Sequence, residues 1–302
     1  MRPLPEQAVH LPFGSGPYRM AMDLVTVPEP AWFEIDHLYP AELAEKRLLL
    51  ESRRGDVFAV VPGSEDARAE TLATIATALT THHPDWFTRG GRILRNHLTG
   101  EDWDMDTPAL DPLEFAGRLV QEDLCLVQGT ADGPVLAAAT LCFPSRWRLS
   151  DKIGKPLAAV HAPVPLYADR LARPVDRFMG HIKPGHIAAR LNWSVLDDPA
   201  LFQPDGKWKR QARPDITAEN VGTRIFLRVE RQTLRRLPAS DAVLFGIRVH
   251  VYPLHRIARH APALAAAVRA LPPEIQHYKS LLPFRDALLA WLDVRSASSA
   301  SR

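Results

Sequence analysis

Two adjoining runs decide the fold of this chain: RVERQTLRRLP at residues 228–238 and AVLFGIRVHVY at residues 242–252. The first combines arginines with a glutamate, and the second is rich in β-branched and aromatic residues, which favour strands. The connecting LPASD at residues 237–241 is typical of a turn. Strands are therefore predicted over residues 224–231 and 242–252. Their arginines should lie close to a core, where they need anionic partners.

Further elements are predicted from apolar periodicity on both sides of this pair. Strands are expected over residues 57–61, 124–128, 135–143 and 188–195, with Asp132-Gly133 as a strong hairpin signal. Helices are expected over residues 40–53, 70–82, 112–120, 175–181, 257–270 and 284–292, and residues 83–111 should be irregular. Hairpin connections and grouped helices favour an α+β fold over a parallel doubly wound sheet. No dinucleotide or phosphate motif follows a strand.

The chain is expected to form one domain with two peripheral segments. Residues 1–40 are rich in proline and aromatic residues and should form an extended N-terminal segment that packs on the body. Residues 41–293 should form a single α+β domain. The serine- and alanine-rich residues 294–302 should fray.

Composition describes an ordinary globular protein. The chain has 302 residues, 46% apolar and 24% charged, which is enough to bury a sizeable core. Its 37 basic and 35 acidic residues leave a net charge of +2, so no nucleic acid partner is expected. No stretch resembles a secretion signal or a membrane span. A cytoplasmic protein without membrane contact is predicted.

The two cysteines, Cys125 and Cys142, lack the close spacing of a metal-binding pair. They are also too few for a structural zinc site or an iron–sulfur cluster. Any such cluster must therefore belong to a partner.

Three histidines are candidate metal ligands. His161 ends the apolar run LAAVH and precedes a stretch in which two prolines restrict the backbone, so it would be held firmly. A lone histidine at a strand end is also a common hydrogen-bonded core residue. His181 and His186 flank a turn-rich stretch, where histidines are usually solvated, and rank second.

Polar residues alternate along two of the predicted strands. In RLNW at residues 190–193, Arg190 and Asn192 should share one face and Trp193 the other. This segment suits either an anion site or an edge strand with one solvated face.

The same alternation places Arg228, Glu230 and Gln232 on one face of their strand. Guanidinium groups bind carboxylates through paired donors, so this arginine-rich run suits a carboxylate ligand. Glu230 could order the arginines as an ion-pair partner, or it could face a pocket and receive a cationic amine.

With three earlier segments, QEDLCL at residues 121–126, CFPSRW at 142–147 and VHAPVP at 160–165, the strands above form an ordered set. This set resembles the haem-dependent oxidative N-demethylase family, which includes the haem subunit of a dimethylamine demethylase. The resemblance covers roughly residues 10–290, and its specificity comes from the order of the motifs.

The resemblance implies a PAS-like antiparallel sheet with flanking helices that form a pocket for haem b. It implies His161 as the axial iron ligand. Glu230, if it faces the pocket, is the candidate catalytic residue. The residues expected to hold the haem are His161, Arg190, Asn192, Trp193, Arg228, Arg231, Gln232 and Arg235.

As an enzyme of this family, the chain would use dioxygen to convert a small secondary amine into a primary amine and formaldehyde. Its electrons would come from reductase or electron-transfer subunits that carry a flavin, a [2Fe-2S] centre and an NADPH site. One alternative is a haem-binding PAS-like sensor, although no output helix or DNA-binding motif is visible. Another is a scaffold that has lost its haem.

Overall fold

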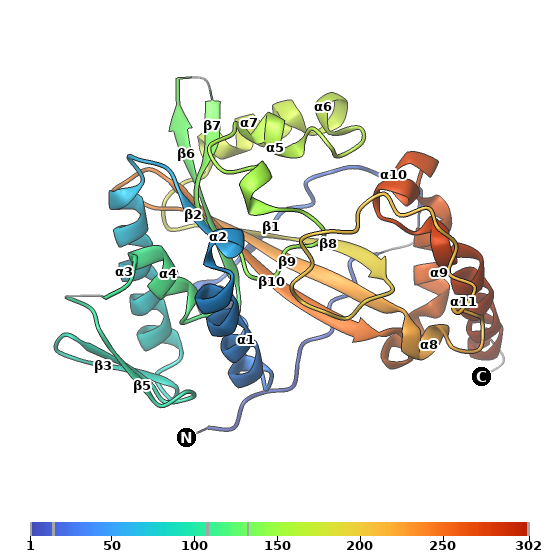
Figure 1. The fold of residues 1–302 in the computed structure, drawn as a ribbon, viewed down its shortest axis with the longest axis horizontal. Coiled ribbons are helices and arrows are strands. Elements are labelled where there is room, and N and C mark those ends of the chain that lie inside the picture. Colours follow the sequence, from blue (N-terminus) through green and yellow to red (C-terminus); the bar gives the residue numbers. More distant parts are fainter. Residues whose placement is uncertain (1, 14–15, 107–108, 132, 301–302) are drawn as a thin grey trace.

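Seven strands form one antiparallel sheet in the computed structural model, which describes residues 2–13, 16–106, 109–131 and 133–300. From edge to edge the order is β1 (Val25–Val27), β8 (Ile187–Leu196), β9 (Phe226–Arg236), β10 (Val243–Pro253), β6 (Asp123–Thr130), β7 (Gly133–Thr140) and β2 (Phe58–Val60) (Figure 1). The predicted α+β class is confirmed, with a large antiparallel sheet and flanking helices.

The long hairpin of β9 and β10 lies at the centre of this sheet. The two strands pair along their whole length, and β8 pairs with the other side of β9, where Asn192 lies opposite Glu230. Because alternate residues of a strand face opposite sides, Glu230 and Gln232 share one face and Arg231 and Arg235 share the other. Both predicted strands are confirmed, and β9 continues further than expected.

The hairpin of β6 and β7 is also confirmed, although Asp132 of its turn lies outside the described residues. The prediction for residues 83–111 is wrong, because they contain a second sheet in the order β3 (Phe87–Gly90), β4 (Ile93–Asn96) and β5 (Glu101–Asp104). These strands are short and mostly polar, with Phe87 and Leu94 buried among exposed neighbours. Such short segments show too few apolar repeats for the sequence to reveal them.

The helices form three groups around the large sheet (Figure 1). The first contains α1 (Tyr39–Ser52), α2 (Arg54–Val57), α3 (Glu65–His82) and α4 (Pro112–Gly117). The second contains α5 (Leu157–His161), α6 (Tyr167–Arg170) and α7 (Ala172–His181). The third contains α8 (Val221–Arg224), α9 (Ala261–Ala270), α10 (Pro273–Tyr278) and α11 (Arg285–Ala300). Short 3-10 helices are η1 (Glu29–Ala31), η2 (Leu149–Asp151), η3 (Leu254–His260, kinked at Ile257) and η4 (Leu282–Phe284).

The first two groups pack on opposite faces of the sheet. Glu42 of α1 is ion-paired with Arg248 of β10, on the face away from the helices α5 and α7. Leu157 of α5 and Met179 of α7 pack against Val127 and Val243 on the other face. The sheet therefore separates two environments.

The third group covers the end of β8, β9 and β10 with a core of its own. Trp291 of α11 and Leu264 of α9 are buried there against Leu227 of β9. The predicted helix over residues 257–270 begins as the 3-10 turn η3 and continues as α9, and α11 extends to Ala300, while residues 301–302 lie outside the described residues. None of the helices in the described part of the chain is both long and apolar enough to cross a bilayer.

Candidate functional site

A cavity of about 540 Å³ lies on the face of the sheet that carries Phe245. Strands β8, β9 and β10 form its floor, and α5, α6, α9 and α10 contribute to its walls. Aromatic side chains line it from several elements: Phe13, Tyr18, Trp147, Tyr167, Trp193, Phe245 and Tyr278. A concave, aromatic-lined cavity of this volume is typical of a cofactor or small-molecule site.

Glu230 lies on the floor of the cavity and is the acid that the sequence had singled out. Its carboxylate accepts hydrogen bonds from the amide groups of Asn192, at 3.2 Å, and Gln232, at 2.8 Å. Burial favours the neutral acid, but a bond from Ser145 and the charge of Arg228 outweigh this effect and hold the pKa of Glu230 below its ordinary value. Glu230 is therefore a buried carboxylate at neutral pH.

His161 lines the same cavity from the last residue of α5. The strand end expected at this position is wrong, because residues 157–161 form a short helix. The Nδ1–H of the imidazole donates to the carbonyl oxygen of Leu157 at 2.8 Å, which leaves Nε2 with the lone pair. Burial lowers the pKa of His161 to about 4, so the ring is neutral at pH 7. Neutral imidazole with one fixed nitrogen is the form that ligates metals.

The competing histidines lie elsewhere. His181 is exposed at the end of α7, and His186 is exposed in the turn before β8. Neither lines the cavity. Among the three candidates, His161 is the one that the fold brings next to Glu230.

Four basic side chains that line the cavity surround the carboxylate of Glu230. They are Lys152, Arg190, Lys207 and Lys279. No ion pair within the described residues neutralises any of them. The Nε of Arg190 is buried without a hydrogen-bond partner among the described residues. Four cations against one buried carboxylate leave an excess of positive charge, which suits an anionic ligand with more than one carboxylate.

The three lysines are positioned by aromatic neighbours. Lys207 donates to the hydroxyl of Tyr278 at 2.9 Å, and Lys279 donates to the carbonyl oxygen of Trp193 at 2.5 Å. The ammonium of Lys152 lies 4.4 Å from the ring centre of Trp147. Burial lowers the pKa of Lys152 and of Lys279 to about 8. Both side chains are still mostly protonated at pH 7, and an incoming anion would raise their pKa values again.

Sequence reasoning missed these lysines. Arginine supplies most of the 37 basic residues of this chain, so each lysine is unusual, and Lys207 directly precedes a tryptophan. The rarity of lysine in this sequence was the signal that could have pointed to these side chains. It could not show that three distant segments meet at one cavity.

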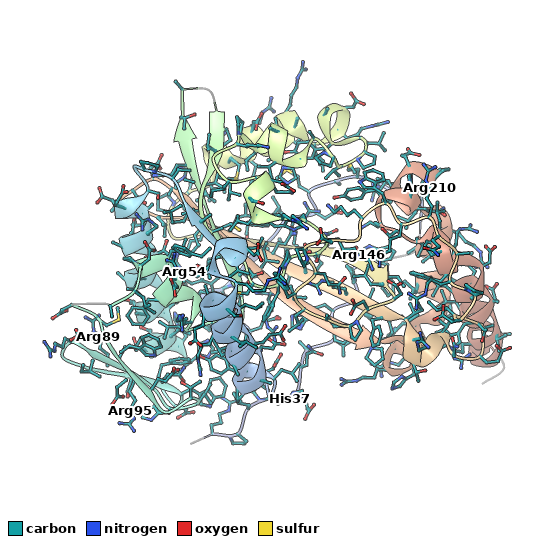
Figure 2. All side chains as sticks on the ribbon, viewed as in Figure 1. His37, Arg54, Arg89, Arg95, Arg146 and Arg210 are labelled. Carbon is teal, nitrogen blue, oxygen red and sulfur yellow. The ribbon has the colours of Figure 1, made fainter. Side chains whose placement is uncertain are left out.

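The arginines of β9 are placed differently from the expectation. Arg228 is 1% exposed. Its guanidinium donates hydrogen bonds to Ser145 Oγ and to backbone carbonyl oxygens that include those of Phe143 and Leu201. It therefore fixes the loops beside the cavity and is not among the residues that line it. A comparable role belongs to Arg146, which lines the cavity but is ion-paired with Asp197 at 2.8 Å (Figure 2).

Arg231 and Arg235 face the opposite side of the sheet. Arg231 contacts Glu34 and the carbonyl oxygen of Trp32, and Arg235 pairs with Glu29. They hold the N-terminal segment and do not line the cavity. Of the eight residues expected to bind the ligand, the fold brings together His161, Arg190, Asn192, Trp193 and Gln232.

These features together define what the cavity can hold. Aromatic walls accept a flat apolar ring system, His161 offers a nitrogen ligand for a metal, and uncompensated cations accept carboxylates. The donor set fits a metalloporphyrin with propionate side chains. Among the described residues that line the cavity, Glu230 is the buried carboxylate that could meet a cationic substrate, and Asp23 is an exposed one.

Residues 24–289 match a family model described as "Haem-dependent oxidative N-demethylase, alpha subunit-like". The match contains all ten strands and all of the cavity lining from β6 onwards. Phe13 and Tyr18, which also line the cavity, precede the matched region.

Proposed function

The chain belongs to the haem-dependent oxidative N-demethylase family as an alpha subunit-like member, and from this membership we propose that its cavity binds haem b to demethylate a small secondary amine such as dimethylamine. Haem dependence and oxidative demethylation follow at the level of the family. The cavity assignment, the substrate and the residue roles are our proposal. The excess of positive charge around a neutral histidine is the observation that carries it.

The residues of the cavity fit each part of a haem. His161 would ligate the iron through Nε2, since its Nδ1 is engaged with Leu157. Arg190, Lys207 and Lys279 would hold the two propionates, because their charges have no partner among the described residues. When bound, the haem would supply the activation of dioxygen that oxidation of an N-methyl group requires.

Glu230 would bind the substrate amine. Its carboxylate is ionised and is oriented by Asn192 and Gln232, so it can pair with an alkylammonium ion and accept its proton. Trp193 of the neighbouring strand β8 lines the same cavity, with an aromatic face that favours cations. The cavity walls would keep bulk water away from this pair, which strengthens the attraction.

The balanced reaction requires an external reductant. Dimethylamine, dioxygen, two electrons and two protons give methylamine, formaldehyde and water. Cys125 and Cys142 are buried and unpaired, and burial raises the pKa of both thiols, so neither is suited to hold a cluster. An alpha subunit implies partner subunits. We propose that these carry the flavin, the [2Fe-2S] centre and the NADPH site, and that the assembly works in the reducing cytoplasm.

The domain organisation belongs to the same proposal. Residues 41–293 would form a single PAS-like haem domain, residues 1–40 a segment that packs on it, and residues 294–302 a tail that begins as the last turns of α11. The large antiparallel sheet with helices on both faces supports a PAS-like description of the core.

The test begins with an absorption spectrum of protein purified from haem-supplemented cells, before and after reduction with dithionite. A Soret band with one haem per chain is expected, followed by amine-dependent formaldehyde release when a reductase and oxygen are supplied. The absence of a Soret band would refute the haem proposal. A stable haem without formaldehyde from any small secondary amine would refute the enzyme and leave a haem-binding sensor.

A further inference from the structure

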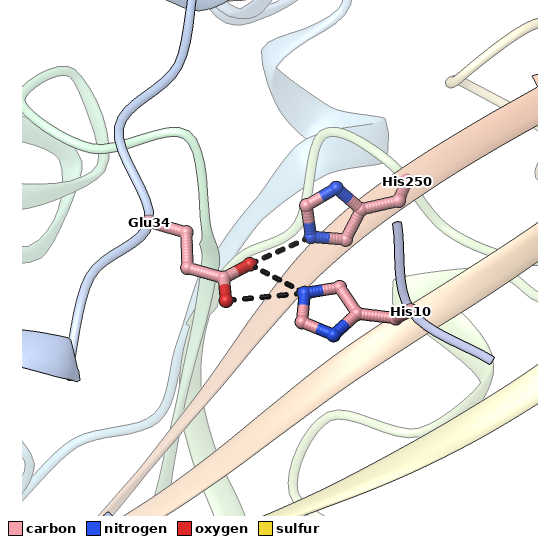
Figure 3. A group of neighbouring side chains, drawn as sticks. All are labelled: His10, Glu34 and His250. Carbon is pink, nitrogen blue, oxygen red and sulfur yellow. Dashed lines mark hydrogen bonds and ion pairs between the residues drawn. The ribbon is translucent and has the colours of Figure 1, made fainter. Parts of the chain in front are cut away.

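A second cluster of metal-ligating side chains lies on the face of the sheet away from the cavity. It consists of His10 and Glu34 from the N-terminal segment and His250 from β10 (Figure 3). Their ligand atoms all lie within 4.8 Å of one another. No role in the proposed demethylation involves these residues.

Both imidazoles approach Oε2 of Glu34, and Nε2 of His10 also lies 3.1 Å from Oε1. Nε2 of His10 lies 3.0 Å from Oε2 of Glu34, and Nε2 of His250 lies 2.9 Å from the same oxygen. Ligands of a tetrahedral zinc ion stand about 3.3 Å apart, since zinc–nitrogen and zinc–oxygen bonds are about 2.0–2.2 Å long. The two distances to Oε2 would need to lengthen by only a few tenths of an ångström to admit an ion.

The other oxygen of Glu34 is already fixed. Oε1 lies 3.2 Å from Nε of Arg231, whose remaining nitrogens donate to carbonyl oxygens of residues 31 and 32. A carboxylate held in this way on one oxygen presents the other at a defined angle, as is usual for carboxylates that bind metals. Arg231 would therefore hold the carboxylate of Glu34 by its Oε1, while Oε2 faces the metal.

The surroundings of His250 also suit a ligand. The side chain is fully buried in β10, and its Nδ1 has no hydrogen-bond partner among the described residues. No second group holds the ring in one tautomer, so its proton can move from Nε2 to Nδ1 when a metal arrives, which frees the Nε2 lone pair. His10 and Glu34 are partly exposed, at 21% and 23%, which gives an ion a route to the cluster.

We propose that His10, Glu34 and His250 bind one divalent transition-metal ion, with zinc as the best match. Two imidazoles and a carboxylate are the ligands that zinc and its neighbours prefer, whereas magnesium and calcium take oxygen ligands. Three protein ligands leave a fourth position for water. The site is separate from the haem cavity, because it lies on the opposite face of the sheet.

Such an ion would fasten the N-terminal segment to the sheet. His10 is close to the residues of that segment that line the cavity, including Phe13 and Tyr18. The segment is otherwise held near this point by Tyr252, whose hydroxyl donates to the carbonyl oxygen of Ala8 at 2.5 Å. Metal binding would thus stabilise the segment that closes the cavity.

The direct test is calorimetric titration of zinc chloride into the full chain after treatment with a chelator, which does not remove haem iron. We expect one zinc ion per chain. The variant His10→Ala should weaken binding at least tenfold, because it removes one ligand from a partly exposed position with little cost to folding. Glu34→Gln should have a similar effect. His37→Ala is the matched control, since His37 is exposed in the same segment, and it should bind zinc like the wild type.

Cobalt gives a second readout that does not depend on affinity. Cobalt bound in this site should produce the intense visible bands of tetrahedral coordination, and His10→Ala should abolish them. Zinc should also raise the melting temperature of the wild type, but not of His10→Ala, by several degrees at roughly 100-fold excess over the dissociation constant. Failure of the wild type to bind zinc, or equal zinc binding by His10→Ala, would show that Glu34 merely holds two imidazoles by hydrogen bonds.

Discussion

His161 and Leu157 are joined by a 2.8 Å hydrogen bond from the imidazole Nδ1–H to the backbone carbonyl oxygen one helical turn earlier. This bond leaves Nε2 as the nitrogen that can ligate a metal. We predict that His161→Ala loses the Soret band or shifts it strongly, because the iron loses its protein ligand. Absorption spectra of the purified variant, with and without dithionite, measure this.

His181→Ala is the control for this experiment, because His181 is exposed on the neighbouring helix α7 and should leave the spectrum unchanged. Added imidazole should restore much of the wild-type spectrum to His161→Ala, since it can occupy the vacated space. A spectrum that changes in His181→Ala but not in His161→Ala would contradict this prediction and assign the iron ligand to His181.

Strand alternation predicted part of this site well. It placed Arg228, Glu230 and Gln232 on one face of β9, and the structure confirms that these residues share a face opposite to that of Arg231. It could not show which face meets the cavity. That choice depends on where α5 to α7 and the N-terminal segment pack, and such long-range contacts leave no local pattern in the sequence.

The local structure at His161 could not be predicted for a related reason. The run LAAVH is too short to show helical or strand periodicity, and its four apolar or small residues suit either. The lysines of the cavity come from three separate segments, so their proximity exists only in the folded chain. The fold class was more predictable, because the hairpins β6–β7 and β9–β10 depend on adjacent strands and their turns.

Lys207 and Lys279 should contribute directly to haem affinity. A hydrogen bond to a charged group is worth about 1.5–3 kcal/mol, so Lys207→Met and Lys279→Met should each weaken haem binding roughly tenfold or more. Haem titration followed at the Soret band measures this. Lys183→Met, at an exposed position outside the cavity, should bind haem like the wild type. Unchanged affinity in both cavity variants would remove the lysines from the propionate site.

Glu230 should act on the amine and not on the haem. Glu230→Gln keeps the size of the side chain and can still bond to Asn192, but it removes the charge that attracts an alkylammonium ion. We expect a normal Soret band together with a KM for the amine that rises roughly tenfold or more. Glu219→Gln, at an exposed acid, should leave both unchanged. A wild-type KM in Glu230→Gln would exclude the carboxylate from amine binding.

The haem-free protein should become more stable between about pH 8 and pH 10. Burial lowers the pKa of Lys152 and of Lys279 from 10.5 to about 8, so in this window the unfolded chain binds more protons than the folded one. Stability therefore rises with pH. The negative charge of Glu230 raises the pKa of both lysines and so opposes the effect of burial. The positive charge of Lys207 lowers the pKa of both lysines, and that of Arg190 lowers the pKa of Lys279.

The measurement is the free energy of unfolding in urea at several pH values for the wild type and for the double variant Lys152→Met and Lys279→Met. The difference between the two proteins isolates the lysines from other groups, such as Tyr278, whose pKa is raised to about 12 by burial and which acts in the opposite direction above pH 10. Parallel pH profiles for the two proteins would contradict the prediction.

Arg248 should be the arginine on which stability depends most. It is fully buried in β10, with guanidinium nitrogens 2.8 Å from Asp36 and 2.7 Å from Glu42. Arg248→Met would leave two buried carboxylates without their cation, and breaking a buried pair in this way costs about 3–5 kcal/mol. The arginine joins the N-terminal segment, α1 and the centre of the sheet, so its loss should also loosen the segment that lines the cavity.

Arg95→Met is the control, because Arg95 lies on the surface of the small sheet (Figure 2) and its ion pair is with exposed Asp102. Surface pairs contribute about 0–1 kcal/mol, so urea unfolding should separate the two variants clearly. Equal stability of both would mean that Asp36 and Glu42 take up protons and stay buried without Arg248.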